Sequence, residues 1–207
     1  DHQMTIKIIS TDKKDKEEIT NLELFVHWEI DQEKYKMVHI KEITEGKKKG
    51  RQMWVHTFKD GKEKKWIRMP RSGKIKDLTG KKSSQKIDLS SITLPLTLLD
   101  KEIIFLKDEQ INEISCKVIE IKEKDGNIRL WIDSIDFIIH KKQLYNKKSE
   151  IEKEVFYGDL TIHNELKFYN HEIIYNHKKD STVEIFLTAF EQKTFDNVDI
   201  FNIPLKK

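Results

Sequence analysis

Apolar and polar residues alternate along most of this chain. A period of two places every second side chain on the same side of an extended backbone, which is the pattern of a β-strand with one buried face. The clearest example is residues 21–30, where every second position is apolar: Leu22, Leu24, Val26, Trp28 and Ile30. We therefore expect a protein that is built mainly of β-strands.

Short turns separate the alternating segments. Asp60-Gly61 and Asp125-Gly126 are typical hairpin signals, and charged runs divide the other segments. The first eighty residues predict an antiparallel meander of about six strands, and further segments follow at hairpin spacing. We predict one curved antiparallel sheet of about eleven strands, an incomplete β-barrel, because so wide a sheet has to curl or close. Residues 1–207 would then form a single domain.

The stretch 87–106 departs from this alternation. Asp88 is a suitable N-cap, and Pro95 divides the stretch into two short helices at about 88–101. Charged residues interrupt it well short of the ~20 apolar residues that a membrane helix needs. It is either a core-packing connection between two halves of a sheet or a mobile apolar lid over a hydrophobic pocket. Its apolar residues lie three and four positions apart, on one face of a helix: Leu89, Ile92, Leu96, Leu99 and Ile103.

The chain carries many charged side chains, and their two signs nearly balance. Its 207 residues carry 39 basic and 36 acidic side chains, for a formal net charge of +3. Nucleic-acid-binding proteins usually concentrate one sign of charge, and they favour arginine for forked contacts to phosphate and guanine. We therefore expect no nucleic-acid partner, because the arginines are few: Arg51, Arg68, Arg71 and Arg129.

The residue types that carry chemistry show no catalytic or metal-binding spacing. The eight histidines lack an HExxH motif, the serines lack a GxSxG motif, and the seven glycines form no phosphate-binding loop. Cys116 is the only cysteine, so it can form no disulfide within the chain, and its apolar neighbours predict a buried thiol. We predict no enzyme activity, no cofactor and no metal, and we favour a binding module.

Several short motifs follow one another in a recognisable order. In the first half they are GRQMW at 50–54, KWIRMP at 65–70, KIKDLTG at 74–80, SSQ at 83–85 and DLS at 88–90. In the second half they are Cys116-Lys117-Val118, RLWID at 129–133 and a strand that ends in Tyr145. In order and spacing these motifs resemble the LolA-like superfamily of bacterial outer-membrane lipoprotein-sorting proteins.

The resemblance implies a curved half-barrel whose concave apolar face is covered by a lid at about 88–101. The cargo would be the acyl chains of lipoproteins. An inner-membrane lipoprotein-releasing transporter would supply them, and an outer-membrane acceptor would receive them after passage through the periplasm. We expect a monomer. The chain starts at Asp1, next to the first expected strand, which indicates that a signal peptide has been removed or trimmed.

Two positions depart from the pattern of the superfamily. Arg68 stands where the family has a tyrosine. In periplasmic carriers an arginine on an early strand ties the barrel to the lid, and alignment of the segment YKMV places Lys36 at that position. Lys36 is therefore a candidate lid latch.

The leading hypothesis is a non-enzymatic periplasmic lipoprotein carrier. The alternatives are an outer-membrane lipoprotein receptor, a glycolipid-binding protein of the same fold, and a non-catalytic envelope interaction protein. The expected cavity depends on strand register, because a slip of one residue moves every side chain to the other face. We expect Leu24, Val26, Trp28, Val38, Ile40, Met53 and Val55 to line the acyl cavity, and Leu89, Ile92, Leu96 and Leu99 to close it.

Overall fold

The computed structural model describes residues 1–28, 34–46, 49–60, 62–80, 101–163, 166–195 and 198–204. The first strands are β1 (His2–Thr11), β2 (Glu17–His27), β3 (Lys34–Glu42), β4 (Gln52–Phe58), β5 (Glu63–Arg68) and β6 (Ile75–Asp77). The later strands are β7 (Ile103–Ile111), β8 (Ile114–Glu123), β9 (Gly126–Asp133), β10 (Ile139–Asn146), β11 (Ile151–His163), β12 (Leu166–Asn176) and β13 (Ser181–Gln192). The 3-10 helix η3 (Val198–Phe201) follows. None of the described helical segments is long and apolar enough to cross a lipid bilayer.

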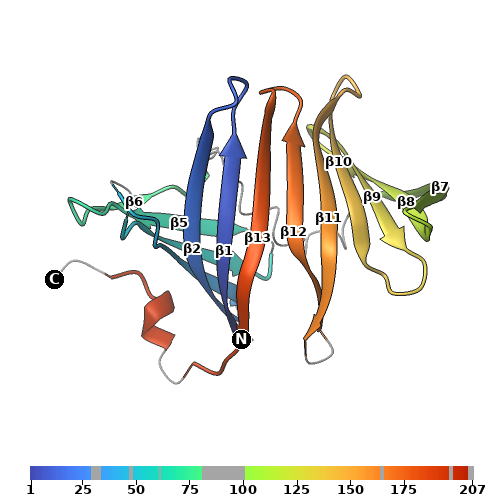
Figure 1. Ribbon diagram of the computed structural model, residues 1–207. Coiled ribbons are helices and arrows are strands. Elements are labelled where there is room, and N and C mark those ends of the chain that lie inside the picture. Colours follow the sequence, from blue (N-terminus) through green and yellow to red (C-terminus); the bar gives the residue numbers. More distant parts are fainter. Residues whose placement is uncertain are drawn as a thin grey trace. The chain divides into compact units, whose positions relative to one another are not determined.

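The strands form one antiparallel sheet in the order β6-β5-β4-β3-β2-β1-β13-β12-β11-β10-β9-β8-β7 (Figure 1). Its two end strands, β6 and β7, do not pair with each other, so the described sheet is not closed into a barrel. This confirms the predicted mainly β, antiparallel fold. It also follows the predicted meander, because six strands precede residue 80 and most neighbours in the sheet are consecutive in sequence.

Among the described residues the sheet has thirteen strands rather than about eleven, and strand β7 explains part of the difference. The sequence pattern placed Ile103 on the face of a helix and read residues 107–110 as the polar end of that stretch. In the structure Ile103 begins β7 and pairs with Ile121 of β8. The helical interpretation was wrong here because β7 is largely exposed, so its apolar residues at 103–106 follow one another and do not alternate with polar ones.

The chain divides into two compact units. The first unit comprises residues 1–8, 19–95 and 187–207, and the second comprises residues 9–18 and 96–186. That residues 1–207 act as one carrier domain stays a prediction.

One face of the first unit is covered by the C-terminal segment that contains η3. Phe25 of β2, Met37 of β3 and Phe201 of η3 form a buried cluster, against which two further apolar side chains of the C-terminal segment pack, those of Phe195 and Ile200. Two hydrogen bonds fix this segment. Trp54 Nε1 donates to the carbonyl of Ile200 over 3.0 Å, and His56 Nε2 donates to the carbonyl of Phe201 over 2.9 Å.

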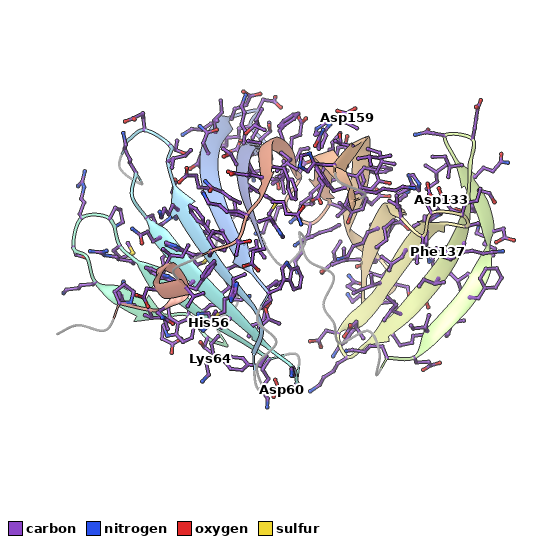
Figure 2. All side chains as sticks on the ribbon, turned by 90° about the horizontal axis from the view of Figure 1, so that it is seen from below. His56, Asp60, Lys64, Asp133, Phe137 and Asp159 are labelled. Atoms are coloured by element: carbon purple, nitrogen blue, oxygen red, sulfur yellow. The ribbon has the colours of Figure 1, made fainter. Side chains whose placement is uncertain are left out.

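Three histidines of the first unit take part in this covered face: His27, His39 and His56. His39 stacks on Trp54 with ring centroids 4.9 Å apart, and His27 stacks on Phe201 at 5.4 Å. Burial lowers the pKa of His39 to about 4, so this ring is neutral at physiological pH. Figure 2 shows His56 beside Lys64, its cross-strand partner in β5. These contacts give the histidines a structural role.

One face of the second unit carries a buried cluster and a polar network. Cys116, Val118 and Trp131 form the cluster, and the Cys116 thiol is fully buried, as its apolar neighbours predicted. Burial also raises the pKa of Cys116, which keeps the thiol protonated. The sequence therefore identified the environment of this cysteine correctly.

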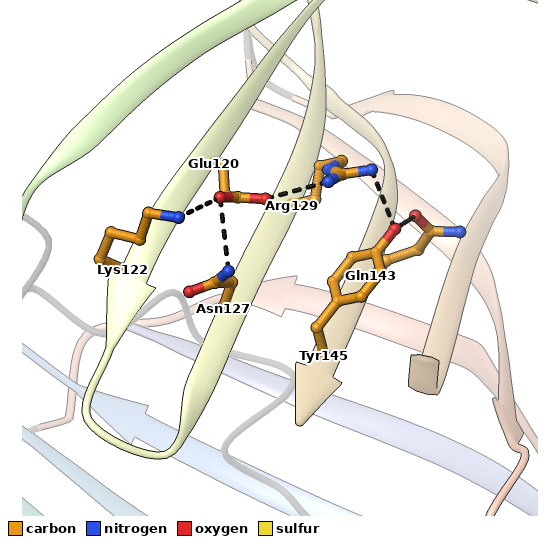
Figure 3. Close-up of polar contacts among 6 residues, drawn as sticks. All are labelled: Glu120, Lys122, Asn127, Arg129, Gln143 and Tyr145. Atoms are coloured by element: carbon orange, nitrogen blue, oxygen red, sulfur yellow. Dashed lines mark hydrogen bonds and ion pairs between the residues drawn. The ribbon is translucent and has the colours of Figure 1, made fainter. Parts of the chain in front are cut away.

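The polar network of the second unit runs across β8, β9 and β10 (Figure 3). Arg129 ion-pairs with Glu120 at 2.9 Å and donates to the hydroxyl of Tyr145 at 3.0 Å. The hydroxyl of Tyr145 donates to Gln143 at 2.6 Å. A hydrogen bond from Lys122, together with Arg129, holds the pKa of Glu120 below its usual range. The buried carboxylate of Glu120 is thus fully compensated, which is typical of a structural network.

Candidate functional site

The register of β2, β3, β4 and β5 places two apolar rows on one face of the first unit. Cross-strand partners point to the same side of a sheet, so each row shares a face. We call this the apolar face of the first unit. One row contains Leu24, Ile40, Met53 and Ile67, and the next contains Val26, Val38, Val55 and Lys65.

Six of the seven residues expected to line the cavity therefore lie side by side. Those on the central strands β2 and β3 are buried, whereas Met53 and Val55 of β4 are half-buried. The opposite face of the same strands holds the cluster around Phe201, so the two faces are chemically distinct. The sequence pattern thus assigned these six side chains to a common face, while their contact with a ligand stays a prediction.

Trp28 does not continue this strand, in contrast to the prediction. Strand β2 ends at His27, and the side chain of Trp28 is 41% exposed. Its backbone N–H donates to Oδ1 of Asp1 over 3.1 Å. The alternation of apolar and polar residues continues beyond His27, where β2 ends. The sequence pattern therefore predicted a strand that is too long.

Lys36 lies on the same face as the apolar rows. Its register partner is Thr57 of β4, which in turn faces Glu63 of β5. The side chain is buried, and its ammonium lies 5.3 Å from the ring centroid of Trp28. Burial lowers the pKa of Lys36, and the charge of Glu63 opposes this effect. Burial of a cation on an apolar face is costly unless the cation is paired. A contact between Lys36 and a lid, as predicted, would provide such a pair.

The expected lid lies outside the described residues, apart from its last position. This applies to the four residues that were predicted to close the cavity: Leu89, Ile92, Leu96 and Leu99. Lys101 lies in a bend and ion-pairs with Glu123 at 2.8 Å. The lid therefore stays a prediction.

The second unit has an apolar face that the sequence analysis did not single out. We call it the apolar face of the second unit. It was missed because the strands of the second half were identified without assigning their faces, although Val183 and Ile185 alternate with polar and other residues in β13 and indicate one apolar face. One row of cross-strand partners crosses five strands, namely Leu130, Lys142, Val155, Ile174 and Val183.

Tyr157 and Glu172 are titratable residues of this second apolar face, which also carries Lys142. Tyr157 of β11 pairs with Glu172 of β12, which pairs with Ile185 of β13. Burial raises the pKa of Glu172 to about 7, and the positive charge of Lys142 opposes the rise. Burial and the charge of Glu172 also raise the pKa of Tyr157. A carboxyl with a raised pKa and a phenol, set on a face that is largely apolar, are the most unusual chemistry of the described residues.

Other groups of polar residues are ordinary structural sites. His140 contacts a residue through each of its ring nitrogens. Its Nδ1 lies 2.9 Å from the Tyr169 hydroxyl, and its Nε2 lies 3.5 Å from Oδ2 of Asp133. Two backbone N–H groups of the following turn hold the pKa of Asp133 below its usual range. Within the described ranges, no cluster of three histidine, cysteine or acidic side chains could hold a metal ion.

The turn between β9 and β10 presents two large apolar side chains to solvent. Ile135 is 82% exposed and Phe137 is 80% exposed. Asp133 fixes the turn, because its Oδ1 accepts the N–H groups of Ile135 at 2.7 Å and of Asp136 at 3.2 Å. Phe137 has a φ of 57°, which is uncommon for a bulky residue. Figure 2 shows Asp133 and Phe137 together in this turn, which we call the β9–β10 tip.

Comparison with known proteins gives a family and a fold. A family model described as "-like: Uncharacterized protein" matches residues 32–202, and no curated protein sequence matches the chain. A DUF1329 family protein from Desulfovibrio piger superposes with a TM-score of 0.85 at 12% identity, covering 97% of this chain and 89% of that chain.

Two further solved structures share the architecture. A putative outer membrane lipoprotein-sorting protein domain from Vibrio parahaemolyticus has a TM-score of 0.81 at 15% identity, covering 97% of this chain and 88% of its own. A LolA superfamily protein from Nitrosomonas europaea has a TM-score of 0.74 at 13% identity, covering 98% and 90%. The chain therefore belongs to the family whose model spans residues 32–202, and its fold is the LolA-like fold that its sequence motifs predicted.

Proposed function

We propose that this protein is a non-enzymatic carrier that binds the acyl chains of lipoproteins on an apolar sheet face and moves them toward the outer membrane. The observation that carries the proposal is the pair of apolar rows on the first unit, formed within a LolA-like fold. The printed description of the Vibrio parahaemolyticus structure, a lipoprotein-sorting domain, points to the same class of cargo.

Such a carrier requires an apolar surface without polar atoms that would lose hydrogen bonds when an acyl chain binds. Each buried methylene contributes about 0.8 kcal/mol, so an acyl chain leaves a membrane only when a comparable surface receives it. Leu24, Val26, Val38 and Ile40 offer only carbon atoms to such a chain, with Met53 and Val55 at the more accessible side. No covalent step, nucleotide or metal is needed for this exchange.

The remaining parts of the proposal follow the LolA-like fold. The carrier works as a monomer and a single domain in the periplasm, between an inner-membrane lipoprotein-releasing transporter and an outer-membrane acceptor. Residues 88–101 form its lid, and Leu89, Ile92, Leu96 and Leu99 close the cavity when no cargo is bound. Lys36, buried on the same face as the apolar rows, ties the sheet to this lid.

A matched pair of variants tests the proposal. Val55→Glu places a charge on the half-buried part of the apolar face, and Ile19→Glu places the same charge on β2 where the native side chain is 45% exposed. We expect wild type and Ile19→Glu to retain a triacylated lipopeptide in solution, and Val55→Glu to lose it at least tenfold. Circular dichroism verifies that both variants fold.

Organic extraction of the purified protein followed by mass spectrometry gives an independent readout. Recovered acyl chains support the proposal. The carrier function is wrong if wild type neither yields lipid nor binds the lipopeptide, or if Val55→Glu folds and binds as wild type does.

The β9–β10 tip favours a second candidate, a lipoprotein receptor that contacts the membrane. Two exposed apolar side chains on a fixed turn are too few for a stable protein interface, which buries about 800 Å² on each partner. They are enough for shallow insertion into a bilayer. Flotation with phosphatidylethanolamine–phosphatidylglycerol vesicles distinguishes the two candidates. Vesicle binding that is lost in Ile135→Ser/Phe137→Ser and kept in Ile103→Ser supports a receptor, and absence of binding by wild type supports a soluble carrier.

A further inference from the structure

Glu172 occupies an unusual position on the apolar face of the second unit. Its cross-strand neighbours are Tyr157 and Ile185. The adjacent row is formed by Val155, Ile174 and Val183, which pair with one another across β11, β12 and β13. Of these, Val155, Val183 and Ile185 are buried. A carboxyl group is therefore set among branched aliphatic side chains on a sheet face where a leucine would pack without cost.

The carboxyl of Glu172 is not fully hydrogen-bonded. Its Oε2 atom is buried and has no hydrogen-bond partner. The side chain as a whole is only half-buried, so a molecule that lies on this face could reach it. Buried polar atoms in folded proteins are almost always paired, and an exception calls for an explanation.

The other partly buried carboxylates of the second unit show what a structural role looks like. Glu120 has Arg129 and Lys122 as partners. Glu154 accepts from Gln143 at 2.6 Å and contacts His177 Nε2 at 2.8 Å. These acids lie on the opposite face from Glu172 and are satisfied within the protein. Glu172 differs from them in both surroundings and pairing.

The environment of Glu172 also determines what it can bind. Burial raises its pKa to about 7, so the carboxyl is protonated in a large fraction of molecules near neutral pH. Lys142 lies on the same face and disfavours a cationic ligand there. An anionic ligand would meet the charge of the ionised carboxylate. Oε2 is an acceptor when the carboxyl is ionised and when the proton is on Oε1, and the complement to this acceptor is a neutral hydrogen-bond donor.

We propose that Glu172, with Tyr157 beside it, is the polar anchor of a ligand site on the apolar face of the second unit. The ligand is an aliphatic chain that ends in an uncharged hydrogen-bond donor, a hydroxyl or an amide N–H. The donor binds Oε2 of Glu172 while the chain lies along the row of Val155, Ile174 and Val183. This inference rests on the proposed acyl-binding function and defines the chemical group that accompanies the acyl chain.

Paired probes that differ only in the donor test the inference. The amide pair is N-methyldodecanamide and N,N-dimethyldodecanamide, and the oxygen pair is dodecan-1-ol and dodecyl methyl ether. Each competes with the neutral fluorophore N-phenyl-1-naphthylamine for the full chain. The two pairs also separate amide recognition from hydroxyl recognition.

In wild type we expect the donor member of at least one pair to displace the fluorophore at an about tenfold lower concentration than its partner. Glu172→Leu removes the acceptor and abolishes this preference, whereas Glu172→Gln keeps a carbonyl acceptor and retains part of it. Glu184→Leu is the matched control, because Glu184 lies on the opposite face and pairs with His171 at 3.1 Å. This control keeps the preference of wild type.

The outcomes separate this inference from the proposed function. Saturable fluorophore binding with no preference for donors in wild type, or an unchanged preference in Glu172→Leu, overturns the anchor and leaves acyl binding intact. If wild type binds neither the fluorophore nor the triacylated lipopeptide, both the anchor and the carrier function are wrong.

Discussion

Replacement of Glu172 by glutamine should change how the stability of the protein depends on pH. Burial raises the pKa of this carboxyl from 4.5 to about 7 in the folded state. Between these two values the folded protein binds more protons at Glu172 than the unfolded chain does. The free energy of unfolding therefore falls as the pH rises through this window, and the loss is complete above about pH 7. Glutamine has no proton to lose, so the variant lacks this contribution.

The magnitude follows from the rise in pKa. A change of one pKa unit corresponds to about 1.4 kcal/mol, so the rise from 4.5 to about 7 corresponds to about 3 kcal/mol. Water at the half-buried side chain reduces this value, which makes about 3 kcal/mol an upper bound. The effect is a large fraction of the 5–15 kcal/mol by which domains are typically stable.

Urea unfolding of wild type and Glu172→Gln at pH 4.5 and at pH 8 measures the effect. Subtraction of the two proteins cancels the titration of all other groups. We expect the stability of wild type relative to the variant to drop by about 2–3 kcal/mol between these pH values. A difference that stays constant within about 0.5 kcal/mol would mean that Glu172 titrates normally and that its burial is not costly.

Two further predictions concern the packing of each unit. Phe201→Ala empties a fully buried position of the first unit and should lower the free energy of unfolding by about 3–5 kcal/mol in urea; a loss below about 1 kcal/mol would show that η3 is not part of the core. Arg129→Met leaves the buried Glu120 without its guanidinium and the Tyr145 hydroxyl without a donor, and should cost about 1–3 kcal/mol. An unchanged urea midpoint would contradict the structural role of this network.

The sequence predicted the strands with a clear period of two, because burial of one face imposes that period. Leu24, Ile40 and Met53 come from three separate segments, yet they occupy one row as the alternation predicted. The period of two failed as a guide where neither face of a segment is buried. Strand β7 is largely exposed, so its charged residues looked like a turn. Trp28 continued the period after the strand had ended.

The candidate sites were harder to predict than the strands. Alternation shows that Glu172 shares a face with Ile174, but it cannot show whether a carboxyl finds a partner. That depends on the cross-strand neighbours, which only the register of β11, β12 and β13 supplies. The buried Lys36 was found for a different reason, namely its place in a motif rather than its surroundings.

The position of Phe201 has a consequence for the order in which the protein can fold during synthesis. The hydrogen bonds from Trp54 and His56 to the C-terminal segment join residues 146 and 145 positions apart in sequence. Residues 96–186, by contrast, form most of the second unit as one continuous segment. The second unit can therefore assemble before residues 187–207 have been made. The first unit must wait until the segment around Phe201 has left the ribosome, and until then its aromatic side chains need protection from other hydrophobic partners.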